Sequence, residues 1–492
     1  MIKRKIQKKI LLMYCFLTIL SVSAQQKVVL TGDYADPSII QVNGVYYMTH
    51  SSFHYAPGLL IWKSTDLEHW IPVTYALQQY HGDVWAPDLV YYKDKFYIYY
   101  PCTYGNFVIT ADKIEGPWSK PYPLNIRGID PGHITDSQGN RYLYMSGGNV
   151  GELSSDGLTV KNNELKKVYD GWAIPDNWAI ECKCLECPKL LFKDGYYHMF
   201  SAQGGTAGPA TSHMVVHARS KSVLGPWENS PINPVVHTYD RNESWWSKGH
   251  GTVFQGLKGD WWIVYHAYDR DNRTLGRNIL FEPVEWTSDG WLRVSTPAQR
   301  ERHQIIEGVV LNRSDNFSGN ELGIQWQFWK AYEPERVKLE NQSLYLQGKG
   351  TNIGESSPLT VIAGHSRYEL SVDVEIVGDA QAGLILFYND KQYVGTATDG
   401  KQLYAGERGA LRPVGKADSK IIKIRILNDF NNVEFFIDGE KVYNGIEVSG
   451  YSTQTFGGFL ALRPAIFCTG KGNAIFRNFC YEPLKQISEL KK

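Results

Sequence analysis

Four carboxyl groups and one imidazole recur at matching places in the first half of the chain, and such side chains can act as general acid and general base. Each stands about 8 to 12 residues ahead of an aromatic pair, at the start of a short apolar stretch. In chain order they are Asp36, Asp88, Asp130, Glu186 and His250. Hydrolysis of a glycosidic bond uses two carboxyl groups, one protonated and one ionised. A fold that brings these residues together would therefore create a hydrolytic site.

Three of the acids form a set suited to this chemistry. A proton stays on one of two neighbouring carboxyl groups at neutral pH only if burial or a further negative charge raises its pKa. Asp36, Asp130 and Glu186 offer such a trio, and the longer Glu side chain suits the group that must reach a leaving oxygen. Asp36 and Asp130 each precede a Pro, so either alone could simply cap a turn. Asp88 is expected to be a hydrogen-bond partner within the same cluster.

The element that must position these residues is repeated five times. Each copy is a polar or Gly-containing turn followed by an aromatic-rich strand, and the spacings between copies are 50, 46, 54 and 65 residues. The copies centre on Tyr46, Phe96, Tyr142, Tyr196 and Trp261. A repeat of this length fits one four-stranded blade of a β-propeller. Because the first strand of every blade lines the central channel, five strand starts would bring the acids and the imidazole to one end of it.

The remainder of the chain is also patterned as strands, so the fold class is all-β throughout. Runs such as RYELSVDVEIV and NVEFFIDGEKVYNG alternate apolar and polar residues, as expected of a two-sheet sandwich. The pattern predicts a five-bladed β-propeller followed by a β-sandwich. The predicted parts are a signal peptide at 1–24, the propeller at 25–303, a linker at 304–314, the sandwich at 315–482 and a tail at 483–492.

The N-terminus has the form of a secretory signal. A basic head precedes an apolar run from Ile10 to Val22 and a V-S-A site that ends at Ala24. That run is shorter than the roughly 20 residues needed to span a bilayer, so no membrane span is expected. The pattern predicts export through a signal peptide to the periplasm or the exterior.

Charge and cysteine content narrow the range of partners. The 51 basic and 51 acidic residues cancel, which argues against nucleic acid and favours an uncharged, polar ligand. Cys182, Cys184 and Cys187 could bind zinc, but no fourth ligand follows at a recognisable spacing, so buried or locally paired thiols are favoured. Cys468 and Cys480 could form a disulfide if their strands are neighbours. The oligomeric state is open.

The motifs carry a family resemblance. YADPSIIQVNGVYYMTHSS, DVWAPDLVYYKDKFYIYY, GIDPGHITD, ECPKLLFKDGYYHMF, GHGTVFQGLKGDWWIVYHAY and LGRNILFEPVEW resemble glycoside hydrolase family 43, the exo-acting β-xylosidases and α-L-arabinofuranosidases. The resemblance covers the N-terminal half in order. The segment from DNFSGNELGIQWQFW resembles the concanavalin-like, jelly-roll sandwich appended to such enzymes, where it can press a loop against the propeller mouth or serve only as an appendage.

The resemblance implies roles for individual residues. Asp36 would be the general base, Glu186 the general acid, and Asp130 the residue that orients the acid and raises its pKa, with inversion at the anomeric carbon. Arg277 would contact the sugar in the cleaved subsite, and Phe53 and Trp85 would offer stacking surfaces. His250 would contribute to substrate binding or hold a water or a calcium ion on the axis. No cofactor is required, although a structural calcium on the axis is left open.

The resemblance also implies a substrate class, and two alternatives compete with it. The expected substrates are plant oligosaccharides or polysaccharides that carry terminal β-D-xylose or α-L-arabinofuranose. A retaining β-fructofuranosidase-like enzyme would share the five-bladed plan and an ECP motif, but the first motif here is ADPSI rather than NDPNG, and Ile129 stands where an Arg would precede Asp-Pro. A non-catalytic glycan-binding propeller is the second alternative, although the intact trio of acids argues against it.

Overall fold

Nearly every regular element of the protein is a β-strand. The computed structural model describes residues 27–295 and 311–485. The predicted signal peptide at 1–24 lies outside these residues, as do most of the predicted linker at 304–314 and the end of the predicted tail at 483–492. Helices that could cross a membrane are absent from the described part of the chain, because none is long and apolar enough.

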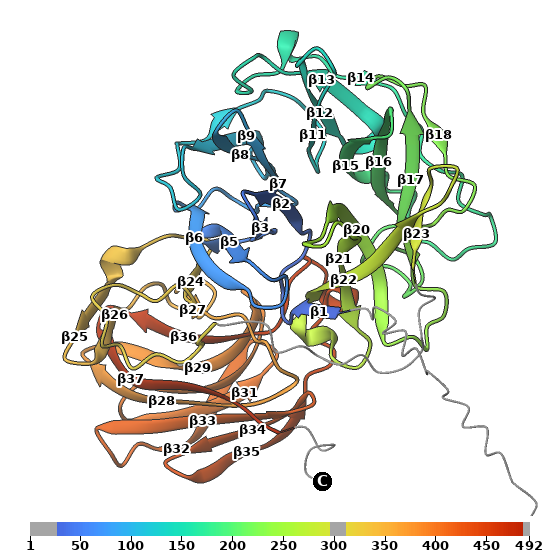
Figure 1. The fold of residues 1–492 in the computed structure, drawn as a ribbon. Helices are drawn as coiled ribbons and strands as arrows, with labels where there is room; N and C mark the ends of the chain where they lie inside the picture. Colours follow the sequence, from blue (N-terminus) through green and yellow to red (C-terminus); the bar gives the residue numbers. More distant parts are fainter. Residues whose placement is uncertain (1–26, 296–310, 486–492) are drawn as a thin grey trace, which may run out of the picture.

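Five antiparallel sheets in the described part surround a common axis, which confirms the predicted five-bladed propeller (Figure 1). The innermost strand of each blade contacts the innermost strand of the next, and the fifth contacts the first, so the ring is closed. These inner strands are β2 (Ser38–Val42), β7 (Asp88–Tyr92), β11 (Gly132–Thr135), β15 (Glu186–Lys193) and β20 (Trp245–Gln255).

The aromatic phrase of each repeat is the second strand of its blade. Alternation places one set of its rings between neighbouring blades, where Tyr46, Tyr99, Tyr144 and Tyr265 are fully buried. The first four blades continue with β3 (Val45–Thr49), β5 (Gly58–Ser64) and β6 (Ile71–Leu77); β8 (Lys95–Cys102), β9 (Gly105–Ala111) and β10 (Tyr122–Pro123); β12 (Arg141–Met145), β13 (Asn149–Glu152) and β14 (Lys166–Lys167); and β16 (Tyr196–Gln203), β17 (Met214–Ser220), β18 (Glu228–Asn229) and β19 (Val236–His237).

The fifth blade joins the two ends of the propeller chain. Its later strands β21 (Trp261–Asp269), β22 (Arg277–Trp286) and β23 (Leu292–Val294) are completed by the first strand, β1 (Lys27–Leu30), which pairs with β22. Short 3₁₀ turns occur at η1 (Ser146–Gly148), η2 (Lys161–Asn163), η3 (Arg273–Leu275) and η4 (Pro334–Arg336). The pairing of β1 with β22 fixes the N-terminal motif beside the last one, so Asp36 and Arg277 are brought together although they are far apart in sequence.

The second half of the chain forms the predicted β-sandwich of two antiparallel sheets. One sheet holds β32 (Ala410–Lys416), β31 (Gln402–Glu407), β30 (Gln392–Thr398), β29 (Ala380–Asn389), β36 (Arg463–Gly470), β27 (Leu359–Thr360) and β24 (Gln327–Trp329). The other holds β25 (Val337–Glu340), β26 (Ser343–Gln347), β37 (Asn473–Pro483), β28 (Arg367–Val377), β33 (Ile421–Asp429), β34 (Asn432–Ile437) and β35 (Glu440–Glu447). A one-turn helix, α1 (Thr453–Phe456), precedes β36.

The sandwich is locked to the propeller by backbone pairing and by a buried ion pair. Strand β24 pairs with β4 (Tyr55–Ala56), a short strand of the first blade, so a propeller segment completes a sandwich sheet. Arg463 at the start of β36 lies with its Nη2 atom 3.1 Å from Asp33 Oδ2, and both side chains are only 1% exposed. The same guanidinium lies 3.5 Å from the centre of the Tyr55 ring. The two units therefore share one continuous interior.

This ion pair should be important for stability, because removal of one partner leaves a buried charge without compensation. We expect Arg463→Gln to destabilise the protein by about 3 kcal/mol, within the range for broken buried pairs. Scanning calorimetry should show a melting temperature several degrees lower than that of the unmodified protein. The matched control is Arg412→Gln on the exposed strand β32, for which a change below about 0.5 kcal/mol is expected. Equal melting temperatures for the two variants would contradict this role.

Candidate active site

Side chains from several blades converge at one end of the propeller axis, as the sequence predicted. His250 Nδ1 lies 3.4 Å from Asp36 Oδ1 and 3.8 Å from Asp130 Oδ2, so the two carboxyl groups flank one ring nitrogen. The backbone N–H of Cys187 donates to Asp130 Oδ2 at 3.2 Å, which places the adjacent Glu186 at the same end. We call Asp36, Asp130, Glu186, His250, His266 and Arg277 the axial cluster.

The backbone of the axial cluster adopts conformations that are uncommon for side-chain-bearing residues. Asp36, Asp130 and His250 have φ values of 63°, 57° and 55°, and such positions concentrate at functional sites. The pairing of β15 with β16 shifts register just after Glu186, and that of β20 with β21 shifts on both sides of Gly249. Bulges of this kind re-aim side chains at the rim of a sheet.

One expectation about these positions was wrong. The sequence predicted that all five residues would open their strands, but β20 begins at Trp245 and His250 lies in its middle. The irregular register around Gly249 allows His250 to reach Asp36 and Asp130 from inside a long strand, whereas the four acidic residues lie at or near the starts of their strands. A bulge is defined by the pairing of two strands, and the sequence pattern of one strand did not reveal it.

A close approach of two blades links Asp130 to the segment that carries Glu186. Gly132, two residues after Asp130, packs against the backbone of Pro188, and a Cβ atom at position 132 would lie 1.6 Å from the Pro188 carbonyl oxygen. Only glycine permits this approach. The approach is what allows the Cys187 N–H to reach the Asp130 carboxyl group.

Asp36 is held as an anion. Arg277 Nη1 donates to Asp36 Oδ1 at 3.1 Å, and the Ser51 hydroxyl donates to Asp36 Oδ2. Burial by itself would raise the pKa of Asp36, but attraction to the Arg277 guanidinium, followed by the contacts with His250 and His266, holds that pKa well below its usual range. Asp36 is therefore ionised at neutral pH and can accept a proton.

Arg277 is the permanent cation of this group. Burial lowers the pKa of His250 to about 3 and that of His266 to about 4, so both rings are neutral near pH 7. His266 Nδ1 lies 3.1 Å from both the backbone nitrogen and Oδ1 of Asp36. The contact of His266 with Asp36 was not predicted, because a lone His in a strand carries no distinguishing signal.

Glu186 and Asp130 are in the opposite electrostatic situation. Burial, followed by repulsion from Asp36 and Glu181, raises the pKa of Glu186 to about 7, even though Arg277 acts to lower it. Burial, followed by repulsion from Glu186 and Asp36, raises the pKa of Asp130 well above its usual value. This pair therefore retains a proton near neutral pH, when Asp36 is already ionised.

Asp88 is neutralised by a cation that sequence reasoning missed. Lys189 Nζ lies 2.7 Å from Asp88 Oδ1 and also donates to the carbonyl oxygens of Pro87 and Pro131, each at 3.0 Å. Asp88 Oδ2 accepts the backbone N–H of His133 at 2.7 Å. Asp88 thus ties three blades together, in line with the hydrogen-bonding role predicted for it. The isolated Lys in the apolar run ECPKLLF was the available signal.

Of the two aromatic residues predicted to contact the substrate, Phe53 lies beside Arg277. Phe53 is 2% exposed and lies 5.3 Å from the Arg277 guanidinium, so in this structure its ring packs against that cation. Trp85 is half-buried and packs against the apolar core that the sandwich shares with the first blade. Phe459 of the sandwich also lies 5.3 Å from Arg277 and is 39% exposed. Phe459 comes from the loop after α1, which sequence analysis could not identify.

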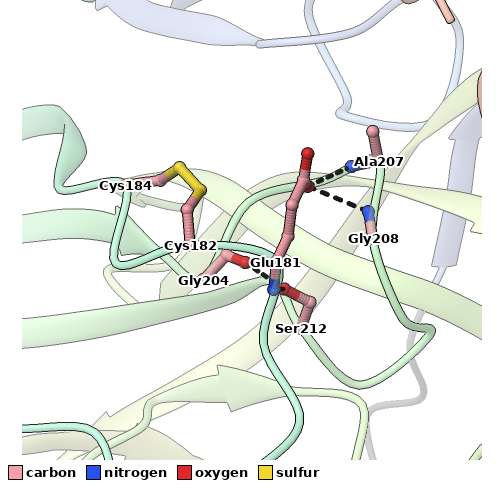
Figure 2. Close-up of a disulfide and its surroundings, with 7 residues drawn as sticks. All are labelled: Glu181, Cys182, Cys184, Gly204, Ala207, Gly208 and Ser212. Carbon is pink, nitrogen blue, oxygen red and sulfur yellow. Dashed lines mark hydrogen bonds between the residues drawn. A yellow bond between two sulfur atoms is a disulfide. The ribbon is translucent and has the colours of Figure 1, made fainter.

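A segment braced by a disulfide precedes the Glu186 strand. Cys182 and Cys184 form a disulfide, as favoured by their local spacing, and Figure 2 shows Glu181 beside it. Glu181 Oε2 accepts the backbone N–H groups of Ala207 and Gly208 at 2.8 and 2.9 Å. Glu181 therefore connects the acid-bearing segment to the loop that follows β16. Cys187 and, in the sandwich, Cys468 and Cys480 are free thiols.

The donor atoms around His250 were tested against the calcium expectation. Asp36, His250 and His266 offer ligand atoms within 4.8 Å of one another. Calcium takes about 6 to 8 oxygen ligands, whereas this set has two imidazole nitrogens and a carboxylate that already accepts from Arg277 and Ser51. These residues do not fit a directly bound calcium ion. A calcium held through water stays a prediction.

Comparison with known proteins gives matches over both halves of the chain. The profile of Glycosyl hydrolases family 43 matches residues 25–292, and that of the Beta xylosidase C-terminal Concanavalin A-like domain matches residues 314–482. A Xylan 1,3-beta-xylosidase of a Vibrio species is 30% identical over 318 residues, which cover 55% of this chain and 57% of that protein. The match thus spans little more than half of that relative.

Two further relatives match over more of their length. A Non-reducing end alpha-L-arabinofuranosidase of Bacteroides ovatus is 28% identical over 428 residues, which cover 78% of each protein. The crystal structure of a xylan beta-1,4-xylosidase from Bacillus halodurans is 25% identical, with a TM-score of 0.80 over 93% of this chain and 100% of that one. Both halves of the present fold therefore occur together in known proteins.

The electrostatics of the axial cluster can be tested by direct titration. We expect the Glu186 carboxyl group to titrate with a pKa of about 7, and Glu181→Gln to lower this pKa because it removes a repelling charge. Carboxyl ¹³C NMR of protein labelled at Glu would measure both values. Glu340→Gln on the distant strand β25 is the matched control and should leave the Glu186 pKa unchanged. A Glu186 pKa near its ordinary 4.5 would show that the described environment is wrong.

Proposed function

The chain belongs to glycosyl hydrolase family 43, and from this premise we propose that it removes terminal pentoses from plant oligosaccharides or polysaccharides by hydrolysis with inversion. In this proposal Asp36 is the general base, Glu186 the general acid and Asp130 the residue that raises the pKa of the acid. Arg277 holds Asp36 ionised and contacts the sugar. The exported form would act in the periplasm or outside the cell.

The single observation that carries the proposal is that the two carboxyl groups lie in opposite electrostatic surroundings, Asp36 beside the Arg277 guanidinium and Glu186 in a buried position near other carboxylates. Arg277 keeps Asp36 ionised, while burial raises the pKa of Glu186 to about 7. An acid and a base in one site must be in opposite protonation states at the working pH. Between the two pKa values, Asp36 can accept a proton and Glu186 can donate one.

The proposed reaction uses each group once. Glu186 donates its proton to the glycosidic oxygen as the bond from that oxygen to the anomeric carbon breaks. Asp36 takes a proton from a water molecule that attacks the opposite face of the same carbon, so the configuration is inverted. The products are the released sugar, the shortened chain, a protonated Asp36 and an ionised Glu186. Proton exchange with solvent restores the starting state.

Asp130 supports the acid through its position. Its carboxyl group accepts the N–H of Cys187, the residue directly after Glu186, so it fixes the start of β15. Asp130 and Glu186 repel each other when both are ionised, which favours retention of a proton by the pair. The contact with Cys187 orients the acid, and the raised pKa values of the pair come first from burial and then from repulsion by neighbouring carboxylates.

The preference for terminal sugars rests on the sandwich. Phe459 reaches the Arg277 guanidinium from the sandwich side, and Leu462 N–H donates to the Thr274 carbonyl oxygen at 2.8 Å, which fixes the end of the same loop on the fifth blade. A wall at this place would prevent a polysaccharide substrate from extending past the site on both sides of the cleaved bond. The relatives named as a xylosidase and as a non-reducing-end arabinofuranosidase favour a terminal xylose or arabinose.

Substitution of the acid and the base tests the assigned roles. We expect Glu186→Gln and Asp36→Asn each to lower kcat on an unactivated oligosaccharide by about 10³-fold, a typical value for general acid and base catalysis. A nitrophenyl glycoside should restore much of the rate of Glu186→Gln, because its leaving group needs little protonation, but not that of Asp36→Asn. Circular dichroism would verify folding. Near-normal turnover by either folded variant would refute its assigned role.

The stereochemistry and the sugar can be tested in one series of assays. We expect a panel of nitrophenyl glycosides to show hydrolysis of β-D-xylosides, α-L-arabinofuranosides or both. Proton NMR in the first minutes of reaction should show the anomer of opposite configuration to the substrate. The first product having the retained configuration would instead favour a mechanism with a covalent intermediate. Absence of hydrolysis across the panel would favour a glycan-binding protein.

A further inference from the structure

A cavity separate from the axial cluster lies between the propeller and the sandwich. Its volume is about 540 Å³, within the range of about 300 to 1,000 Å³ that is common for small-molecule sites. Its wall includes residues of the fourth and fifth blades and one residue of helix α1. We call it the side groove and define it by Pro209, Tyr239, Arg241, Trp246, Arg273 and Gln454.

The side groove begins close to the axial cluster, because several chain segments run from one to the other. Trp246 and His250 are four residues apart on β20, and Arg273 at the start of η3 is four residues before Arg277 at the start of β22. Four residues span at most about 14 Å. On the sandwich, Gln454 lies in the groove wall, and Phe459 of the following loop lies over Arg277.

The groove also lies on the side of the proposed acid. The loop after β16 contributes Pro209 to the groove wall, and β16 is the strand that pairs with β15, on which Glu186 stands. Glu181, five residues before Glu186, accepts the N–H groups of Ala207 and Gly208 in this same loop (Figure 2). Because the acid protonates the leaving group, the part of the substrate that leaves would extend toward this side.

The wall of the groove is held in place by the surrounding structure. Glu243 Oε1 accepts the N–H groups of Tyr239 and Asp240 at 2.8 and 3.2 Å, and Glu243 Oε2 lies 2.6 Å from Lys248 Nζ. Trp246 Nε1 donates to the Arg241 carbonyl oxygen at 2.8 Å, which fixes the indole ring. These contacts organise the groove before any ligand binds, which reduces the entropic cost of binding.

The side chains of the groove point to a sugar that carries a negative charge. Tyr239 is 63% exposed, and Trp246 is half-buried with the Arg273 guanidinium 5.2 Å from its ring. Over the described ranges, neither Arg241 nor Arg273 has a carboxylate within ion-pair distance. The acidic residue of the wall, Asp240, accepts the Asn242 N–H at 2.8 Å. Two guanidinium groups beside aromatic rings suit a sugar ring that bears a carboxylate.

We propose that the side groove binds a hexuronic acid residue of the polysaccharide, next to the terminal sugar that is removed. Arg241 and Arg273 hold its carboxylate, and Tyr239 and Trp246 contact its ring. Gln454 closes the sandwich side of the groove. This inference rests on the proposed glycosidase function and specifies its substrate as an acidic polysaccharide.

The test compares three matched oligosaccharides that differ only next to the terminal sugar: one neutral, one with a hexuronic acid and one with the corresponding uronamide. We expect kcat/KM of the unmodified protein to be about 10-fold higher for the hexuronic acid than for the neutral compound, and the uronamide to lose most of this gain. Arg241→Gln and Arg273→Gln should each reduce the ratio toward 1. Arg412→Gln on β32 is the matched control and should keep both the ratio and the rate.

Turnover and recognition can be separated by measuring binding to the full-length Glu186→Gln variant. Calorimetry should show about 10-fold tighter binding of the hexuronic acid compound than of the neutral one, and this preference should fall as salt is raised. Hydrolysis of nitrophenyl glycosides together with a ratio of 1 in both assays would overturn the groove proposal and leave the proposed function intact. Preferential binding without hydrolysis of any glycoside would overturn the proposed function and leave the groove proposal intact. A preference that survives both Arg substitutions would also overturn the groove proposal.

Discussion

The number of buried cations near the propeller axis determines which carboxyl groups there can be ionised. Asp36, Asp88, Asp130 and Glu186 are brought together by the fold, but only two cations accompany them in the described structure. Arg277 pairs with Asp36, and Lys189 pairs with Asp88. Removal of a carboxylate from water without compensation costs several kcal/mol, so the remaining two groups favour retention of a proton. The proposed acid and base follow from this imbalance.

The pairing of each cation with one carboxylate also explains why Asp88, one of the recurring acids, has a structural role. Lys189 bonds Asp88 and two backbone carbonyl oxygens from neighbouring blades, so this pair stabilises the ring of inner strands. Lys189 stands on β15, three residues after Glu186. One short stretch of β15 therefore carries both Glu186, whose pKa is raised, and Lys189, the cation that pairs with Asp88.

The sandwich belongs to this arrangement because it closes one side of it. Strand β24 pairs with β4, a propeller segment that completes the sandwich sheet, and Arg463 pairs with Asp33 of the propeller. These contacts fix the loop that places Phe459 against Arg277 and the helix that places Gln454 in the side groove. A movement of the sandwich would thus alter the surroundings of Arg277, which controls the charge of Asp36. The cluster and the groove share this dependence on the second domain.

The sequence by itself determined the repeated architecture and the identity of the acids. A phrase of turn and aromatic strand that recurs five times can be recognised because alternation and turn residues are local properties. The register of Asp36, Asp130 and Glu186 relative to that phrase was local too. The fold class and the family followed from these motifs.

Only the tertiary structure decided the electrostatics of the site and the shape of its surroundings. The contacts of Asp36 with Arg277 and His266 join residues more than 200 positions apart, and no local pattern reports such pairs. The position of His250 within β20 depends on bulges, and the placement of Phe459 depends on how two domains meet. Charge pairing and burial are properties of the assembled interior, where distance in space rather than in sequence sets the energy.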